Sequence, residues 1–297
     1  SDDDSAAFLR KHYPQVELLL LDKNYGYAEG YNRALEQVAA DCYVLLNSDV
    51  EVEEGWLGPL AKLMASNERI AALAPKILSY DRPGYFEYAG ASGGFLDAFG
   101  YPFCRGRILD TIEQDDGQYD TSRDVFWASG ACMMVRADVF RKLGGFDGDF
   151  FAHMEEIDFC WRAQLAGYRI MVEPRSRVFH LGGGTLPNNS PRKLYLNYRN
   201  NLSMLYKNLS KLTLWPLLFT RMVLDGMSAF VFLMQGRRDF FKVVFRSHMD
   251  FYKILGMLRA KRRAIQRDRT GSAAGNIYRG SIILRHALGR RTFGRMM

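Results

Sequence analysis

The sequence CYVLLNSD, residues 42–49, joins a short apolar run to three polar residues. An apolar run of this length that stops at a turn signal predicts a buried strand. VELLLLD at 16–22 and IAALAPKIL at 70–78 have the same character, and we expect all three to be strands of one sheet. Helical spacing of apolar residues marks the intervening segments 24–40 and 55–66. The alternation predicts a right-handed, doubly wound, mostly parallel α/β sheet.

The middle of the chain gives a weaker pattern. Residues 79–126 are rich in Gly, Asp and Tyr, and we expect long loops with short strands near a binding site. A strand and a short helix are predicted within 125–147, followed by a helix over 154–166. Two short strands, YRIMVEP at 168–174 and SRVFHLGG at 176–183, complete this part.

The C-terminal third is predicted to be helical. From Pro191 to about Ala260 no strand signal occurs, so we expect one domain over 1–190, a helical region over 191–260 and a basic tail over 261–297. From Gly236 onward, 16 lysines and arginines face only 3 acidic residues, although the whole chain carries +7. The basic character therefore belongs to the tail.

Composition excludes several classes of protein. With 297 residues and 48% apolar content, the chain is expected to form one large domain, or a domain with an appendage. The 4 cysteines lie far apart without a CxxC pair, so we expect a reduced compartment and no cysteine zinc site. The first residues, SDDDSAAFLRKHYP, are acidic and polar and do not resemble a signal peptide.

Two polar clusters follow predicted strands, where ligands bind in open α/β sheets. Asn47, Ser48 and Asp49 could hold a divalent cation that bridges phosphates, although a polar turn would have the same composition. NYGYAEGYN, residues 24–32, could bring backbone amides to a phosphate or sugar, but it is neither GxGxxG nor a P-loop.

Three carboxylates crowd into FFAHMEEIDFCWR, residues 150–162. Asp158 and Arg162 are spaced i and i+4 on a helix and are expected to pair. Glu155 and Glu156 do not share a face, so one of them could point at the sheet edge and accept a proton from a hydroxyl nucleophile. An acidic first turn favoured by the helix dipole would explain the same two residues without any catalytic role.

Two histidines were considered as ligands. His180 ends a predicted strand directly before the glycine run 182–184 and Thr185, a pattern that suits a metal or phosphate ligand on a mobile loop. His153 precedes the carboxylates. Taken singly, a histidine at such a position more often has an ordinary structural role, and this holds for both residues.

Together these motifs resemble the inverting glycosyltransferases of family 2, which have the GT-A fold, and in particular their bacterial rhamnosyltransferase-like branch. The resemblance covers residues 17–208 and rests on five segments in order. These are NYGYAEGYN (24–32), LLNSDVEV (45–52), WASGACMMVRADVF (127–140), GGFDGDFFAHMEEIDFCWRAQLAGYRI (144–170) and VFHLGGGT (178–185). The resemblance implies a Rossmann-like GT-A domain followed by helices.

The resemblance also implies roles for particular residues. Asn47-Ser48-Asp49 matches the family's Asp-x-Asp motif, with Asp49 as the Mn²⁺ or Mg²⁺ ligand and Asn at the first acidic place. Glu156 matches the usual catalytic base, with Glu155 in contention or in support, and Asp158 completes the catalytic set through its orienting pair with Arg162. His180 matches a histidine that reaches the metal or diphosphate. The donor nucleotide would lie against a set expected from the matching motifs: Asn24, Gly26, Gly30, Asn32, Asn47, Ser48, Trp127 and Gly130.

The implied partners are a nucleoside-diphosphate sugar, with UDP- or dTDP-linked donors favoured, and a glycan or lipid-linked acceptor used in cell-surface polysaccharide synthesis. Family members usually begin with a further strand and an Asp-rich segment, which this chain is expected to lack before SDDDS. The apolar segment 211–245 contains Arg221 and Asp225, so we expect it to lie in the membrane interface rather than to span it. The following basic residues would face an anionic membrane on the cytoplasmic side of the inner membrane.

Other functions are weighed against this one. A sugar-nucleotide pyrophosphorylase would carry a basic, Gly-rich N-terminal signature, which the sequence does not show. Nucleic-acid binding is not expected, because the part of the chain before Gly236 is net acidic. A non-catalytic GT-A scaffold or interaction protein at the membrane stays open, as does a helical subdomain packed on protein with a solvated tail.

Overall fold

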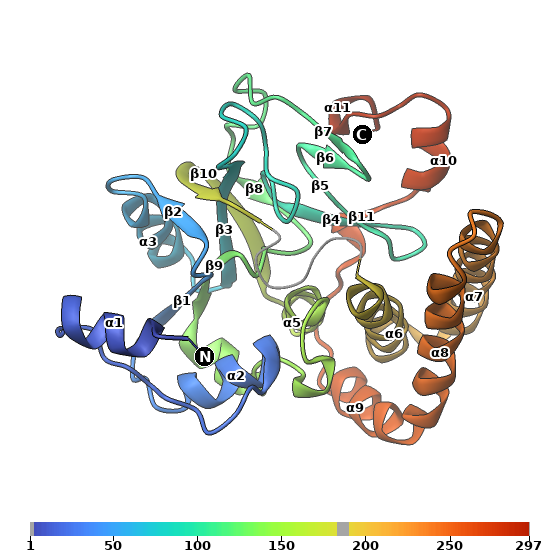
Figure 1. Ribbon diagram of the computed structural model, residues 1–297, viewed down its shortest axis with the longest axis horizontal. Helices are drawn as coiled ribbons and strands as arrows, with labels where there is room; N and C mark the ends of the chain where they lie inside the picture. The colour runs from blue at the N-terminus through green and yellow to red at the C-terminus, as the bar shows by residue number, and fades with distance from the viewer. Residues whose placement is uncertain (1–2, 183–189, 297) are drawn as a thin grey trace.

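The computed structural model describes residues 3–182 and 190–296, and its centre is a six-stranded sheet (Figure 1). The strand order is β1-β9-β3-β10-β2, and β8 pairs with β10 off this path. The strands are β1 (Cys42–Leu46), β2 (Val50–Val52), β3 (Ile70–Ser79), β8 (Arg123–Asp124), β9 (Cys132–Arg136) and β10 (Arg169–His180). The predicted strands at 42–49 and 70–78 are confirmed.

The direction of the strands differs from the predicted, mostly parallel sheet. β3 and β10 are parallel, but β9 lies between β1 and β3 and runs antiparallel to both. β2 is antiparallel to β10. The sheet is therefore mixed, because β9 is reached through the long segment 79–126, whose path local periodicity does not define. YRIMVEP and SRVFHLGG form one strand, β10, with a register shift between Glu173 and Arg177.

The predicted strand at 16–22 is wrong. These residues form no strand, and Leu20 is 63% exposed. A strand exists only where a neighbouring strand satisfies its N–H and C=O groups, and within the described residues β1 pairs on one side only, with β9. The helices on either side of this stretch are α1 (Ser5–His12) and α2 (Gly26–Leu35).

Three helices of at most 11 residues flank the sheet. The helices predicted at 55–66, within 125–147 and at 154–166 are confirmed. They are α3 (Leu57–Ser66), α4 (Ala137–Lys142) and α5 (Glu155–Leu165). A 3-10 turn, η1 (Gly148–Phe150), comes shortly before α5. Nearly every residue of α5 is buried, so its first turn is held rigidly against the sheet.

Residues 79–126 contribute to a second sheet that also includes the end of the chain. Its strand order is β11-β4-β5-β6-β7, with the elements β4 (Gly94–Asp97), β5 (Pro102–Cys104), β6 (Arg107–Ile108), β7 (Thr111–Ile112) and β11 (Ile277–Tyr278). β11 pairs with β4 in parallel, after the short turn η2 (Ala274–Asn276).

Residues 261–297 were expected to form a separate basic tail, and the pairing of β11 with β4 shows that this expectation is wrong for the described residues. The helix α9 (Leu255–Arg267) passes through residue 260, and α10 (Ile282–Ala287) and α11 (Phe293–Met296) follow β11. Ile282 and Phe293 are buried, and the ring of Phe293 packs on Phe95 and Phe103. These apolar contacts hold the segment on the second sheet despite its charge.

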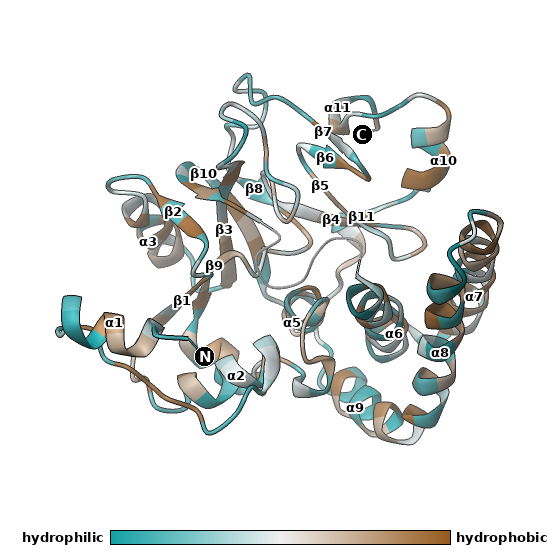
Figure 2. Ribbon diagram, viewed as in Figure 1, coloured by the Kyte–Doolittle hydropathy of each residue, from teal (hydrophilic) through white to brown (hydrophobic). Residues whose placement is uncertain are grey.

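The helical C-terminal region is confirmed. It comprises α6 (Pro191–Asn208), α7 (Lys211–Met234), α8 (Arg238–Lys253) and α9, with α6 next to α5. Figure 2 shows α7 as a largely apolar helix at the edge of the molecule. Among the described residues, α7 alone is long and apolar enough to cross a membrane by length and composition, with 22% of the tested window buried.

Candidate active site

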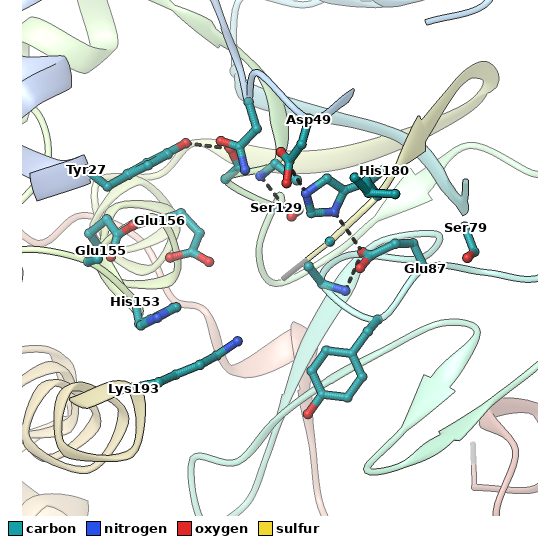
Figure 3. A pocket seen from close by; sticks show the side chains of 18 of the residues that line it. Tyr27, Asp49, Ser79, Glu87, Ser129, His153, Glu155, Glu156, His180 and Lys193 are labelled. Atoms are coloured by element: carbon teal, nitrogen blue, oxygen red, sulfur yellow. Dashed lines mark hydrogen bonds and ion pairs between the residues drawn. The ribbon is translucent and has the colours of Figure 1, made fainter. Parts of the chain in front are cut away.

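A cavity of ≈ 690 Å³ lies between the sheet, the start of α2, the start of α5 and the start of α6 (Figure 3). In Figure 3, Glu155 and Glu156 are on one side of this cavity, and Asp49, His180 and Glu87 are on the other. The structure thus brings together residues from motifs that are more than a hundred positions apart in the chain. The predicted site residues that line it are Asn24, Gly26, Asn47, Asp49, Gly130, Glu155, Glu156 and His180.

Glu155 and Glu156 both line the cavity and both lack a partner at one oxygen. Glu155 is 4% exposed, and the Oε2 atoms of both residues are buried with no hydrogen-bond partner among the described residues. Leaving such an oxygen unsatisfied is costly unless a ligand or substrate uses it. An acidic first turn that served only the helix dipole would not require this burial.

Burial determines the protonation of the pair. Desolvation raises the pKa of Glu156 to about 7, although the backbone N–H groups of Glu156 and Ile157 act in the opposite direction. Desolvation, with the neighbouring charge of Glu156, raises the pKa of Glu155 well above its usual value. Near neutral pH, Glu156 can therefore exchange a proton.

The turn that delivers these carboxylates has an unusual backbone. Phe151, His153 and Met154 have φ values of 64°, 68° and 73°, in the left-handed region that non-glycine residues rarely adopt. The turn packs closely on the start of α2, where a Cβ on Gly26 would lie 2.5 Å from the carbonyl oxygen of Phe151. Such strain persists only where surrounding contacts enforce it, and it is concentrated at functional sites.

On the opposite side, His180 lies between two carboxylates. Its Nε2 is 3.2 Å from Asp49 Oδ1, and its Nδ1 is 3.4 Å from Glu87 Oε2. Burial lowers the pKa of His180, but the carboxylates of Glu87 and Asp49 outweigh that effect and raise it overall. Both ring nitrogens are buried, and neither makes a well-directed hydrogen bond to a described residue.

These donors fit a divalent cation. Carboxylate and imidazole are suitable ligands for Mn²⁺, and two adjacent ligands at about 2.1 Å from an octahedral ion lie about 3 Å apart, close to the Asp49–His180 separation. Within the described residues no group of three His, Cys, Asp or Glu side chains is arranged around one point. Asp49 and His180 would therefore leave most positions to phosphate oxygens and water, as is usual for such ions in phosphate sites.

The start of α2 is fixed against the strand ends by side-chain hydrogen bonds. The Tyr27 hydroxyl donates to the carbonyl oxygen of Gly130 at 2.5 Å, and Tyr31 donates to that of Leu46 at 3.2 Å. Asn24 accepts from the backbone N–H of Gly26 at 2.8 Å, which shapes the loop before the helix. The loop thus has a fixed conformation at the rim of the cavity.

Asp158 does not line the cavity. The predicted pair with Arg162 is confirmed, with 2.8 Å between Asp158 Oδ2 and Arg162 Nε. The other carboxylate oxygen lies 2.9 Å from Lys207 Nζ and accepts from Asn208. Asp158 is fully buried and holds α5 on α6, because a buried carboxylate needs cationic partners. The expectation that Asp158 belongs to the catalytic site is therefore wrong, and its role is structural.

Four other predicted residues lie away from the cavity. Asn32 binds the backbone N–H and C=O of Phe146, and Trp127 is buried with its Nε1 donating to the Phe95 carbonyl at 3.0 Å. Ser48 is exposed in a turn, and Gly30 lies within α2. Matching motifs include residues that hold the fold as well as residues that face the ligand. Positions 183–185 of the predicted glycine run lie outside the described residues.

Several residues that line the cavity were missed as site residues or given no role. Glu87 comes from the segment 79–126, which gave no readable pattern. Tyr27 and Ser129 lie inside quoted motifs, and His153 was weighed singly without its neighbours. Burial lowers the pKa of His153 to about 4, so its imidazole is neutral. Arg192 and Lys193, at the start of α6, bring positive charge to the same cavity.

Comparison with known protein sequences gives one family. Residues 1–144 match the model of glycosyl transferase family 2. A rhamnosyltransferase of Mycobacterium tuberculosis, named N-acetylglucosaminyl-diphospho-decaprenol L-rhamnosyltransferase, is 28% identical over 184 residues, which is 57% of this chain and 60% of the relative. Rhamnosyltransferase WbbL of Escherichia coli K12 is 29% identical over 163 residues, or 52% of this chain and 61% of the relative. The matched regions thus span about 60% of the length of these relatives.

Solved structures share the fold at low sequence identity. S. aureus TarS, solved in complex with UDP-GlcNAc, matches with a TM-score of 0.52 and 14% identity over 97% of this chain and 80% of that chain. GalNAc-T7, solved with UDP, GalNAc and Mn²⁺, matches with a TM-score of 0.51 and 13% identity over 69% of this chain and 39% of that chain. The expected GT-A fold with an added helical region is thereby confirmed. In its first half and in its fold, the chain is thus similar to the family 2 glycosyltransferases, and the curated relatives that it resembles include rhamnosyltransferases.

Proposed function

We propose that the protein is an inverting glycosyltransferase that moves a sugar from a nucleoside diphosphate to a hydroxyl group of a lipid-linked surface glycan. The observation that carries this proposal is the pair of buried carboxylates with unpartnered oxygens, which faces a second acidic and imidazole cluster across one cavity. Two separated polar clusters suit a reaction in which one side activates a nucleophile and the other holds a leaving group.

Glu156 is the proposed general base. With a pKa of about 7, its carboxylate can accept the proton of the acceptor hydroxyl as that oxygen bonds to the anomeric carbon. The bond from the anomeric carbon to the diphosphate oxygen breaks at the same time, so configuration inverts. Glu155 lies beside it in the first turn of α5, and desolvation, with the neighbouring charge of Glu156, raises the pKa of its carboxyl group as well.

Asp49 and His180 are the proposed ligands of a Mn²⁺ or Mg²⁺ ion. When bound, such an ion stabilises the negative charge that develops on the departing diphosphate. Glu87 lies at the other nitrogen of His180 and can hold the imidazole ring in position. Asn47, at the neighbouring position of the motif, lines the same part of the cavity and offers an amide.

The donor is proposed to be a UDP- or dTDP-linked sugar. TarS and GalNAc-T7 were both solved with uridine nucleotides, and the curated relatives of M. tuberculosis and E. coli described above are named as rhamnosyltransferases. The loop from Asn24 to Gly26 and the backbone at Gly130 are proposed to contact the nucleotide, because both line the cavity and have fixed conformations.

The acceptor is proposed to be lipid-linked, as the name of the M. tuberculosis relative states for that protein. The surface of the helical region supports a membrane location. Side chains of α7 and α8 expose a broad apolar face, comprising Leu212, Trp215, Phe219, Met227, Phe230, Met234, Phe241 and Phe245. An exposed apolar face of this extent marks an interaction surface.

The charges beside this face favour an anionic membrane. Arg246 and Lys253 of α8 have side chains that are 76% and 72% exposed. Within α7 the charged pair Arg221 and Asp225 is buried against the protein, so it does not interrupt the exposed face. We therefore propose peripheral attachment at the cytoplasmic face of the inner membrane through α7 and α8.

Thermal unfolding with a panel of nucleotides tests the proposal. In Mn²⁺, we expect UDP or dTDP to raise the unfolding temperature, while GDP and CMP do not. Asp49→Ala should lose this response, because its carboxylate is the proposed metal ligand. A response that is unchanged in Asp49→Ala would contradict the assigned metal site, and no response to any nucleotide would favour a non-catalytic scaffold.

A further inference from the structure

One side chain of α6 contacts most of the strained turn that precedes α5. Asn200 is fully buried, and its Nδ2 lies 2.9 Å from the carbonyl oxygen of Phe150, 3.0 Å from that of Ala152 and 2.8 Å from that of His153. The two N–H groups of a single amide are therefore shared among three carbonyl groups within four consecutive residues, so one of these hydrogen bonds is bifurcated. No regular helix or strand could present its carbonyl oxygens in this way.

The orientation of this amide is determined by its neighbour. Arg199 donates to Asn200 Oδ1 from Nε at 2.9 Å and from Nη2 at 2.7 Å. The guanidinium group has no acceptor, so the oxygen of Asn200 must face it and the nitrogen must face the turn. Arg199 Nη2 also donates to the carbonyl oxygen of Asp149 at 2.7 Å, which extends the contact by one residue.

The turn needs such support because its backbone is strained at three residues. Phe151, His153 and Met154 all have left-handed backbones without being glycine. Met154 is also the N-cap of α5, and its side chain makes no capping hydrogen bond. Glu155 and Glu156 follow directly, so the conformation of the turn sets where their carboxylates point.

We propose that Asn200 is a positioning residue that holds the two carboxylates in their catalytic orientation by fixing the carbonyl groups of residues 150–153. This inference rests on the proposed function of the pair. Asn200 does not line the cavity and touches no substrate, so it acts only through the turn. Its loss should lower turnover far more than it weakens nucleotide binding, because Asp49 and His180, the proposed metal ligands, lie on the opposite side of the cavity from the turn.

Asn200→Asp is the direct test. The substitution keeps the size of the side chain and the pairing with Arg199, but it places an oxygen against the three carbonyl oxygens. Asn200→Ala is the second variant, which removes both contacts. Asn201→Ala is the matched control, because Asn201 is equally buried on the same helix but bonds no carbonyl group of the turn. Its amide nitrogen donates to the carbonyl oxygen of Gly100 in a different loop, and its one contact with the turn is a distance of 4.0 Å to Met154 Sδ.

Two readouts separate positioning from folding. Hydrogen exchange of the segment 150–156 should become at least about tenfold faster in both Asn200 variants and stay unchanged in Asn201→Ala. The kcat should fall about 100-fold in the Asn200 variants, as expected for a misplacement of about 1 Å, while binding of the nucleotide with Mn²⁺ changes less than about twofold. The kcat of Asn201→Ala should stay within about threefold of the wild type.

Three outcomes would overturn the inference. The first is unchanged exchange of residues 150–156, and the second is faster exchange with a kcat equal to that of Asn201→Ala. The third is failure of both Asn200 variants to fold while Asn201→Ala folds, which would make Asn200 a purely structural residue. If the wild-type protein shows no turnover, the proposed function fails. The exchange measurement then still tests whether Asn200 fixes the turn.

Discussion

Replacing Glu156 by glutamine should make the protein more stable above neutral pH while removing its activity. The folded-state pKa of Glu156 is about 7, against 4.5 for an unperturbed glutamate, because its carboxyl group is desolvated beside the cavity. The folded protein therefore binds more protons than the unfolded chain between these two pH values. The stability contributed by this group is complete below pH 4.5 and is lost as the pH rises through about 7.

The size of the effect follows from the two pKa values. Their difference corresponds to about 3 kcal/mol, since one pKa unit is 1.36 kcal/mol. This figure is an upper bound, because the side chain is partly exposed and solvent screening reduces the effect. Glutamine has nearly the same shape and cannot ionise, so the stability of Glu156→Gln should lie within about 1 kcal/mol of the wild type at pH 5 and exceed it at pH 8 by up to about 3 kcal/mol.

Urea unfolding at pH 5 and pH 8, followed by tryptophan fluorescence, measures this difference. Desolvation, the main cause of the raised pKa of Glu155, is the same in both proteins and cancels in the comparison, whereas the smaller part due to the charge of Glu156 is present only in the wild type. Parallel loss of stability by the wild type and Glu156→Gln between pH 5 and pH 8 would refute the reasoning, because it would show that the carboxylate of Glu156 is well solvated or paired.

Three further predictions concern other parts of the molecule. Glu87→Gln should weaken Mn²⁺ binding about tenfold in a titration followed by electron paramagnetic resonance, because it removes the carboxylate beside His180 Nδ1; equal affinity would exclude a supporting role for Glu87. Leu212→Asp combined with Phe219→Asp should abolish flotation with anionic liposomes, because these side chains are 89% and 71% exposed on α7. Unchanged flotation would show that another surface binds the membrane. A dimer that dissociates in the variant would show that a second copy of the chain covers this face. Asp158→Ala should lower the free energy of unfolding in urea by about 3–5 kcal/mol, because it leaves Arg162 and Lys207 buried without this carboxylate. Asp250 is more exposed, so Asp250→Ala should lower it by about 1 kcal/mol or less. Equal losses would contradict the role given to burial.

Local pattern was sufficient for most elements of the fold. The apolar runs at 42–49 and 70–78 are strands, and α3, α5 and the helical C-terminal region lie where periodicity predicted them. The run at 16–22 has the same composition but forms no strand, because strand formation depends on a partner that composition does not reveal. The direction of β9 and the return of β11 to β4 are likewise set by distant parts of the chain.

The candidate site was partly visible in the sequence. Asp49, His180 and the two glutamates were found because acidic and imidazole groups at strand and helix ends are chemically distinctive. Asn32 and Trp127 were expected at the nucleotide because they lie in the matching motifs. They bond instead to the backbone of Phe146 and Phe95, and these partners can be identified only in three dimensions. The contacts of Asn200 with the turn before α5 are also invisible in the sequence, since an asparagine within a helical pattern carries no sign of what it touches.

The most direct test of the account is the rate at which the nucleoside diphosphate is released from the donor that the binding panel selects, measured side by side for the wild type, Glu155→Gln and Glu156→Gln. We expect Glu156→Gln to bind the nucleotide normally and to lose about 10²–10⁴-fold in rate, with a smaller loss for Glu155→Gln. We also expect the wild-type rate to rise with pH through about 7. Rates in both variants that equal the wild-type rate would contradict the assignment of this carboxylate pair as the catalytic centre.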